Sequence, residues 1–103
     1  MKHTKEQIIE KAKIIVKDLR GKYYSENCID DAFFREKEYV DFGKHNGKTM
    51  QCWVVSVLFF EGRFNFLTIS DVSGEPLYYQ NINTIMFEIE KTKDGTYYKV
   101  DPE

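Results

Sequence analysis

Residues 49–60, with the sequence TMQCWVVSVLFF, constrain the fold of this chain most strongly. No residue from Cys52 to Phe60 is charged, and side chains alternate between the two faces of a strand. One face of such a strand carries Met50, Cys52, Val54, Ser56, Leu58 and Phe60, and the other carries Gln51, Trp53, Val55, Val57 and Phe59. Both faces are largely apolar, which is typical of a strand covered on both sides. A buried helix is the competing interpretation, but the β-branched and aromatic content and the turn residues Glu61-Gly62 favour the strand.

An amphipathic helix is predicted over residues 5–20. Thr4 and Gln7 have the spacing of a capping box, and Gly21 indicates the end of the helix. Apolar residues recur at helical spacing at Ile8, Ala12, Ile15 and Leu19. At 1.5 Å per residue the helix is about 24 Å long, which is enough to lie across several strands.

The rest of the chain predicts a connection over residues 21–35, with a short helical turn at residues 29–34, and a sheet over residues 36–101. Strands are predicted at residues 36–42, 49–60, 63–70, 77–80, 84–91 and 96–100. In the fifth of these, Ile85, Phe87 and Ile89 are expected to point inward. Short turns between strands predict an antiparallel meander. The 103 residues are therefore expected to form a single domain of the α+β class, with one long N-terminal helix packed on a curved antiparallel sheet of five to six strands.

No signal peptide or membrane-spanning stretch is visible, so a cytoplasmic location and no contact with membrane are expected. Cys52 is interpreted as a small core residue, and a disulfide with Cys28 is the alternative.

Catalytic chemistry is not expected. The two histidines, His3 and His45, lie near the N-terminus and in a predicted turn, and a pairing of Cys28 with His45 lacks an orienting third group. No phosphate-binding glycine loop or zinc spacing occurs. We therefore expect a protein that is not an enzyme and that has no catalytic residues, metal or cofactor.

The charges are unevenly distributed although the net charge is −2. The basic residues of the first 22 positions are interpreted as the solvated face of the helix rather than as a nucleic-acid site. The following segment mixes acidic and aromatic residues, a composition suited to a basic protein partner. The candidate partner-binding residues are Tyr23, Tyr24, Glu26, Asp30, Asp31, Phe33, Glu36, Glu38, Tyr39 and Asp41.

One helix hides only one face of a sheet, so something else must cover the second face. The alternatives are the sheet closing on itself, the connection over residues 21–35, a second copy of the chain, and a different partner. A curved sheet over a helix also leaves room for a small-ligand pocket lined by aromatic residues.

Two segments carry a family resemblance: the strand Trp53-Val54-Val55-Ser56-Val57 and, after the strand at residues 66–69, the turn Asp71-Val72-Ser73-Gly74-Glu75-Pro76. The tryptophan strand and the Ser-Gly-Glu turn resemble those of PepSY-like and cystatin-like domains, over residues 49–80. The chain is also similar to the small immunity proteins of bacterial polymorphic-toxin and contact-dependent growth-inhibition systems, some of which share the helix-plus-sheet build. PepSY domains are usually exported, so the immunity proteins, which are small, cytoplasmic and often acidic, fit better.

The resemblance implies an antitoxin function, in which the protein binds a cognate toxin domain, often a nuclease, and blocks its active or substrate-binding surface. Binding residues differ between members of such families, so none is transferred here. The alternative is a small-ligand-binding or enzymatic domain with a cone-shaped α+β fold, and a homodimeric scaffold is a third interpretation.

Overall fold

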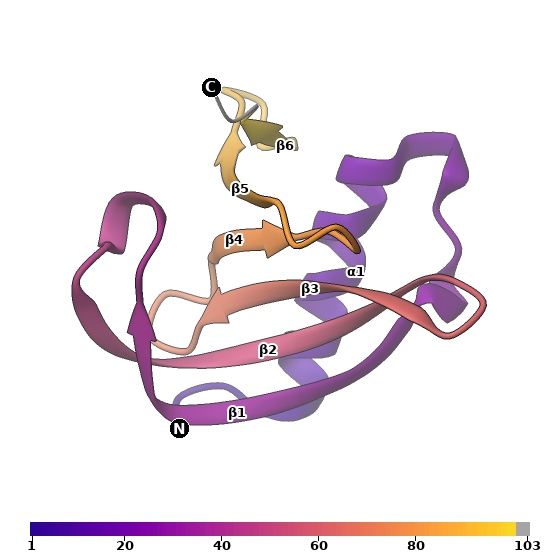
Figure 1. Cartoon of the computed structure of the whole chain (residues 1–103). Helices are drawn as coiled ribbons and strands as arrows, with labels where there is room; N and C mark the ends of the chain where they lie inside the picture. Colours follow the sequence, from indigo (N-terminus) through magenta and orange to yellow (C-terminus); the bar gives the residue numbers. More distant parts are fainter. Residues whose placement is uncertain (101–103) are drawn as a thin grey trace.

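The computed structural model describes residues 1–100 of the chain, so the predicted end of the sheet at residue 101 lies outside the described residues. The structure consists of α1 (Lys5–Arg20) followed by β1 (Ile29–Val40), β2 (Lys48–Phe60), β3 (Arg63–Ser70), β4 (Pro76–Gln80), β5 (Met86–Lys91) and β6 (Tyr97–Val100). Three 3₁₀ turns, η1 (Gly21–Tyr23), η2 (Glu26–Cys28) and η3 (Gly43–His45), lie in the connections. Each strand pairs antiparallel with the next in the order β1-β2-β3-β4-β5-β6 (Figure 1). The α+β class and the meander are confirmed.

The helix begins and ends as the sequence predicts. The Thr4 hydroxyl accepts a hydrogen bond from the Gln7 backbone N–H at 3.1 Å, and the Gln7 side-chain oxygen accepts one from the Thr4 N–H at 2.8 Å. Gly21 follows with φ of 58°, a left-handed conformation that glycine adopts without steric cost. Its N–H donates to the Lys17 carbonyl and closes the last turn. At sixteen residues, α1 is too short and too polar to cross a membrane, and no other helix among residues 1–100 is longer.

The predicted connection over residues 21–35 is too long, and the predicted helical turn at residues 29–34 is wrong. β1 begins at Ile29, because pairing with β2 extends the strand toward its N-terminal end. Two register shifts, one between Ile29 and Asp31 and one between Arg35 and Glu38, interrupt the two-residue alternation. The sequence of β1 therefore lacks the regular two-residue alternation of apolar and polar side chains by which a strand is recognised.

The inward orientation predicted for the fifth strand is correct at Ile89, which is buried, and wrong at Ile85, which is exposed. β5 begins only at Met86. Asn81 accounts for the difference, because its side-chain oxygen accepts the N–H groups of Asn83 and Ile85 and holds the preceding residues in a turn.

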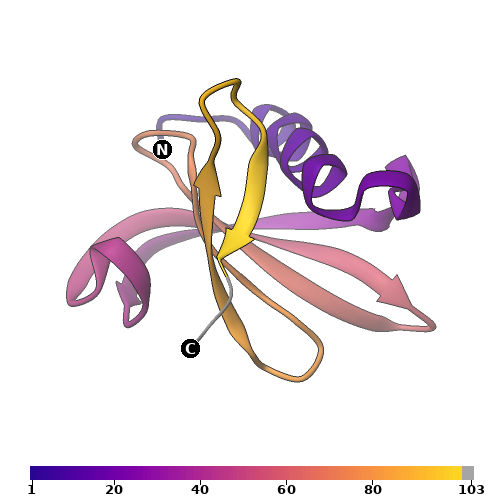
Figure 2. The same ribbon diagram turned by 90° about the horizontal axis from the view of Figure 1, so that it is seen from above.

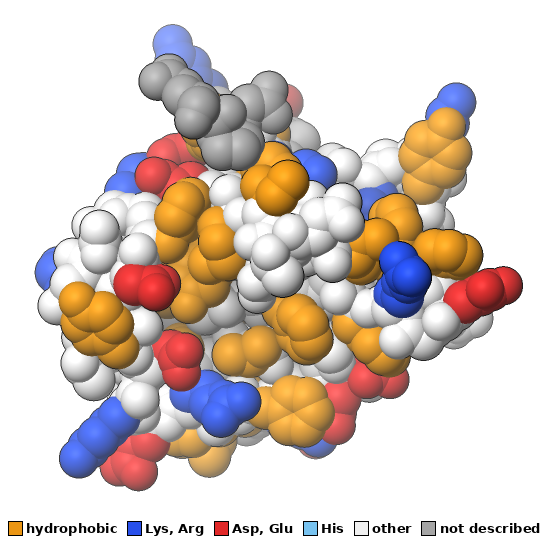
Figure 3. All heavy atoms as spheres, viewed as in Figure 1, with side chains coloured by type: hydrophobic (Ala, Val, Ile, Leu, Met, Phe, Trp, Pro, Cys, Tyr) orange, Lys and Arg blue, Asp and Glu red, His pale blue; other side chains and the backbone are white. Residues whose placement is uncertain are grey.

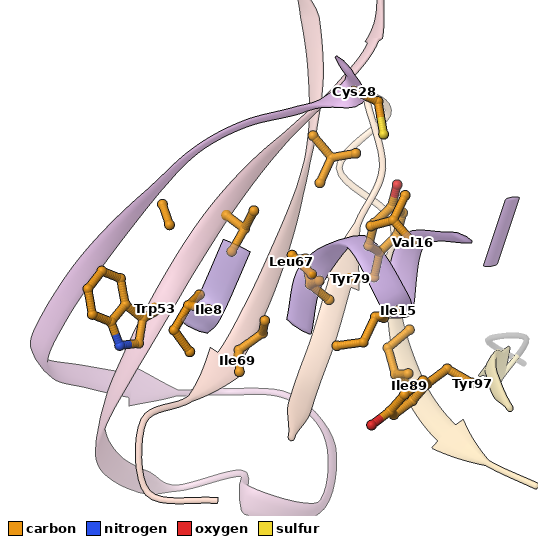
Figure 4. Packing of buried hydrophobic residues seen from close by; sticks show 14 residues of the cluster. Ile8, Ile15, Val16, Cys28, Trp53, Leu67, Ile69, Tyr79, Ile89 and Tyr97 are labelled. Carbon is orange, nitrogen blue, oxygen red and sulfur yellow. The ribbon is translucent and has the colours of Figure 1, made fainter. Parts of the chain in front are cut away.

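One face of the sheet packs on the helix. Figure 4 shows Ile8, Ile15 and Val16 of the helix among sheet side chains that include Trp53, Leu67, Ile69 and Tyr79. Burying an aliphatic side chain of this size contributes about 1.5–3 kcal/mol, so this cluster is the main source of stability. The sheet curves strongly, and α1 contacts both edge strands, β1 and β6 (Figure 2).

The prediction that β2 is covered on both faces is correct only in part. Cys52 and Ser56, on the face away from the helix, are buried, but Val54 and Leu58 of the same face are only partly buried. The connection between β1 and β2 folds over the end of the sheet nearest Cys52, where the Phe42 ring meets the Tyr78 ring edge-on at 6.3 Å. Cys28 and Cys52 are both free thiols, so the structure forms no disulfide between them.

Candidate functional site

The face of the sheet opposite α1, here called the helix-free face, has no helix packed over it (Figures 1 and 3). The strand register places one side chain from each strand in a continuous row across this face. The row runs from β1 to β6 through Phe33, Val54, Thr68, Tyr78, Glu88 and Val100. Hydrophobic side chains gather over the middle strands in Figure 3, with charged groups around them. The curved sheet therefore presents a mixed apolar and charged surface to solvent.

A hollow of about 540 Å³, here called the face hollow, lies on this surface. Aromatic residues remain exposed beside it: Phe33 has 49% and Phe66 has 39% of its surface accessible. The side chains that line the hollow come from β1 to β5 and from the β1–β2 connection: Arg35, Glu38, Asp41, Val54, Phe66, Thr68, Tyr78, Gln80 and Met86. Its lining thus joins apolar side chains with three charged ones.

The carboxylates of Glu38 and Asp41 give the hollow a negative edge. Burial raises the pKa of the Tyr78 hydroxyl, and the negative charges of Glu38 and Asp41 raise it further. Burial likewise raises the pKa of the Cys52 thiol to about 11, with a smaller contribution from Glu38. Cys52 is therefore an inert thiol at neutral pH. Within residues 1–100, Arg35, Glu38 and Asp41 take part in no ion pair, so these charges are available to a partner.

The ten predicted partner-binding residues do not form one patch. They lie along the twelve residues of β1, in the turns before it and, for Asp41, directly after it. Glu38 and Asp41 line the face hollow and Phe33 lies in the row beside it. Glu36 and Tyr39 are exposed elsewhere on β1.

The remaining five predicted residues lie away from the hollow or are engaged within the protein. Asp31 contacts Lys5 at 2.6 Å, and this hydrogen bond is the main reason why the pKa of Asp31 is lowered. Asp30 accepts a hydrogen bond from Ser56. Tyr24 packs against the core cluster, whereas Tyr23 and Glu26 are exposed in η1 and η2.

Sequence reasoning missed the part of the surface that lies beyond β1. Val54, Phe66, Tyr78 and Met86 come from four other strands, and none belongs to the acidic segment. The feature that could have predicted this surface is the meander, because its register brings alternate residues of successive strands into one row. Which residues meet depends on the exact pairing of the strands, and the bulges of β1 shift that pairing.

A second, more polar pocket of about 270 Å³ lies between η3 and strands β4 and β5. The Tyr97 hydroxyl donates to Glu75 at 2.7 Å, and burial together with this carboxylate raises the pKa of Tyr97 to about 12. Lys91 pairs with Glu75 at 3.2 Å, and Lys44 pairs with Glu90 at 2.8 Å. These carboxylates are neutralised by lysines of the chain itself. Residues 1–100 bring no three metal-ligating side chains together.

Trp53 and Asp71, which belong to the pattern that carries the family resemblance, have a structural role here. The Trp53 indole N–H donates to the buried Asp71 carboxylate at 2.9 Å. The backbone N–H groups of Lys2 and His3 donate to the same carboxylate at 2.5 and 3.0 Å. The pair therefore fastens the segment before α1 to the β3–β4 turn.

The geometry of the helix-free face is the basis on which a function is inferred for this chain. Comparisons of the chain with protein-family models, with curated proteins and with solved structures found no match.

Proposed function

We propose that this chain is a non-enzymatic immunity protein that binds a toxin domain through the helix-free face and blocks a basic surface of that domain. One observation carries the proposal: a six-strand sheet buries one face under α1 and leaves exposed aromatic residues and unpaired carboxylates on the other. Exposed apolar patches with a polar rim are typical of protein interaction sites.

The two kinds of side chain on this face have complementary roles in binding. Aromatic residues such as Phe33 and Phe66 supply large apolar contact areas, and side chains of this type dominate the energy of many interfaces. The carboxylates of Glu38 and Asp41 attract a positively charged partner and speed its approach. A nuclease needs a basic surface to hold phosphates, so a nuclease domain has the complementary charge.

The test uses a toxin domain encoded beside the gene for this chain. Its expression should arrest bacterial growth, and coexpression of the wild-type chain should restore growth. The variant Phe66→Asp places a charge in the middle of the helix-free face and should abolish both rescue and binding. The matched control is Ile14→Asp, because Ile14 is an exposed apolar residue on α1, away from this face.

Equal rescue by the two variants would contradict the assignment of the face. Failure of the wild-type chain to bind the neighbouring domain would contradict the immunity function itself. Circular dichroism of both variants establishes that each is folded before the comparison is made.

Small-ligand binding or enzymatic activity by a cone-shaped α+β domain is the second candidate. The polar pocket beside η3 favours it, because His45, Glu75 and Tyr97 gather there. Native mass spectrometry of the purified protein distinguishes the two. A bound small molecule released only on denaturation supports the second candidate, and a ligand-free mass counts against it.

A further inference from the structure

A third hollow, of about 260 Å³, lies on the helix side of the sheet, opposite the helix-free face. It is formed where the C-terminal end of α1 meets the end of β2, the β4–β5 connection and β6. We call it the helix-side hollow. The side chains that matter for its chemistry are Arg20, Phe59, Asn65, Tyr79, Asn81 and Lys99.

Unsatisfied hydrogen-bonding groups are concentrated at this hollow. Among residues 1–100, three buried side-chain atoms lack a hydrogen-bond partner: Arg20 Nη2, Asn65 Oδ1 and His45 Nδ1. The first two belong to side chains that line the helix-side hollow. Asn65 is more than nine-tenths buried, with 5% of its surface accessible. Buried polar groups are nearly always paired with protein, water or a ligand, so two unpaired groups at one hollow leave hydrogen-bonding capacity for a bound group.

The neighbours of these two groups fix their positions. Arg20 Nη1 donates to the Leu58 carbonyl at 3.0 Å, which holds the guanidinium in place and leaves Nη2 free. The amide nitrogen of Asn65 lies 2.6 Å from the Tyr79 hydroxyl. A half-turn of the amide exchanges its oxygen and nitrogen, so that Tyr79 donates to the oxygen and the nitrogen becomes the free atom. Asn65 is therefore able to offer a donor to a ligand without any movement of the backbone.

The charge of the hollow selects a negatively charged ligand. Among residues 1–100, Arg20 and Lys99 are the charged side chains in its lining, and no acidic side chain accompanies them. Neither cation takes part in an ion pair within the described residues. The C-terminal end of α1 contributes a partial negative charge of about half an elementary charge, which two full positive charges outweigh. Asn81 adds a further amide, since its oxygen accepts the N–H groups of Asn83 and Ile85 while its nitrogen has no hydrogen-bond partner within residues 1–100.

We propose that the helix-side hollow binds a small oxyanion, a phosphate or carboxylate group, through Arg20 Nη2, Lys99 Nζ and the Asn65 amide. The rings of Phe59 and Tyr79 supply apolar walls for an organic substituent on that anion. A guanidinium suits either oxyanion, because its N–H groups match the geometry of carboxylate and phosphate oxygens. The site is independent of the proposed immunity function, since it lies on the opposite side of the sheet from the helix-free face.

The test is a titration of ¹⁵N-labelled protein with inorganic phosphate, with phenyl phosphate and with benzoate, at constant ionic strength, followed by NMR. Backbone signals of Asn65, Asn83 and Lys99 should shift saturably with at least one of these anions, and sodium chloride should not reproduce the shifts. Lys99→Met should weaken binding about tenfold, as expected for the loss of one charge-assisted hydrogen bond. Lys93→Met is the matched control, because Lys93 is an exposed lysine in the β5–β6 turn, and it should change the affinity less than twofold.

The double variant Asn65→Leu/Tyr79→Phe separates a binding role from a structural one. It removes both members of the buried Asn65–Tyr79 hydrogen bond at nearly constant volume, so anion binding should be lost while the melting temperature without anion stays nearly unchanged. The proposal is overturned by the absence of saturable shifts with all three anions, or by equal loss of affinity in the Lys99 and Lys93 variants. Phe66→Asp should leave anion binding unchanged. A failure of anion binding and a failure of the proposed immunity function therefore give different experimental results.

Discussion

At the scale of single residues, Asp71 is the buried carboxylate that joins the N-terminal segment and β2 to the β3–β4 turn. Its side chain is fully buried, yet its ionised form is favoured because three N–H groups donate to it, those of Lys2, His3 and the Trp53 indole, and the N-terminal ammonium forms an ion pair with it at 4.0 Å. Burial raises the pKa of Asp71, but the hydrogen bonds outweigh burial and the pKa is lowered overall. A buried carboxylate is tolerated only when it is paired in this way.

Removing this carboxylate should be costly. Asp71→Ala leaves several buried donors unpaired, and we expect it to lower the free energy of unfolding by about 3 kcal/mol. Urea denaturation followed by Trp53 fluorescence measures the change. Asp41→Ala removes an exposed aspartate as the control and should change stability by less than about 0.5 kcal/mol. Similar values for the two variants would contradict the structural role of Asp71.

Acid should destabilise the protein through Asp71 and Glu75. Their folded-state pKa values lie below the ordinary values of 3.8 and 4.5, because hydrogen bonds and lysine charges outweigh the effect of burial. Their contribution to stability is therefore complete above those ordinary values and is lost as pH falls through the lowered folded-state values. Denaturation midpoints measured from about pH 5 to about pH 2 should fall for the wild type and fall less steeply for Asp71→Asn. Parallel curves would mean that Asp71 is not linked to acid stability.

At the scale of elements, the capping box sets where α1 begins. Thr4→Ala removes the hydroxyl that accepts the Gln7 N–H and should cost about 1 kcal/mol. Thr4→Ser keeps an acceptor at the same position and should restore most of that loss. Chemical denaturation of the two variants gives the comparison, and a Ser variant as unstable as the Ala variant would show that the cap contributes nothing.

β1 carries the charges expected to guide a partner to the helix-free face. Glu38→Lys reverses a carboxylate that lines the face hollow, so it should slow association with the toxin domain by about tenfold at low salt, with a smaller change in dissociation. Glu10→Lys makes the same charge change on α1 and is the matched control. Stopped-flow or surface plasmon resonance measurements at two salt concentrations test this prediction. Equal association rates for the two variants would show that Glu38 does not lie at the interface.

At the scale of the whole molecule, the edge of the sheet is protected against pairing with a second copy. β1 is an edge strand, and the segment Arg35-Glu36-Lys37-Glu38 places four charges where the register with β2 shifts. Charges and bulges on an edge strand oppose edge-to-edge pairing. Light scattering should therefore give the mass of a single chain, 12.3 kDa. Twice that mass would contradict this prediction and would weaken the case for a different partner.

The local features of the fold are readable from the residues. Thr4, Gln7 and Gly21 set the ends of α1, and the apolar alternation from Cys52 to Phe60 indicates β2, because capping and burial act on neighbouring side chains. The bounds of β1 were not predicted, since its register shifts erase the period and only pairing with β2 holds residues 29–35 as a strand. Of the candidate site, Glu38 and Asp41 were identified from sequence, and the hollow that they line was not.

The sequence by itself determined that one amphipathic helix lies on an antiparallel meander, since both patterns depend on spacing along the chain. Only the tertiary structure decided which side chains share a surface. Phe33, Val54, Thr68 and Tyr78 form one row because three separate strand pairings, shifted by bulges, bring them side by side. Arg20 and Asn65 line one hollow because the fold brings the C-terminal end of α1 beside β3. Contacts between distant segments depend on register and curvature, which no local pattern of residues records.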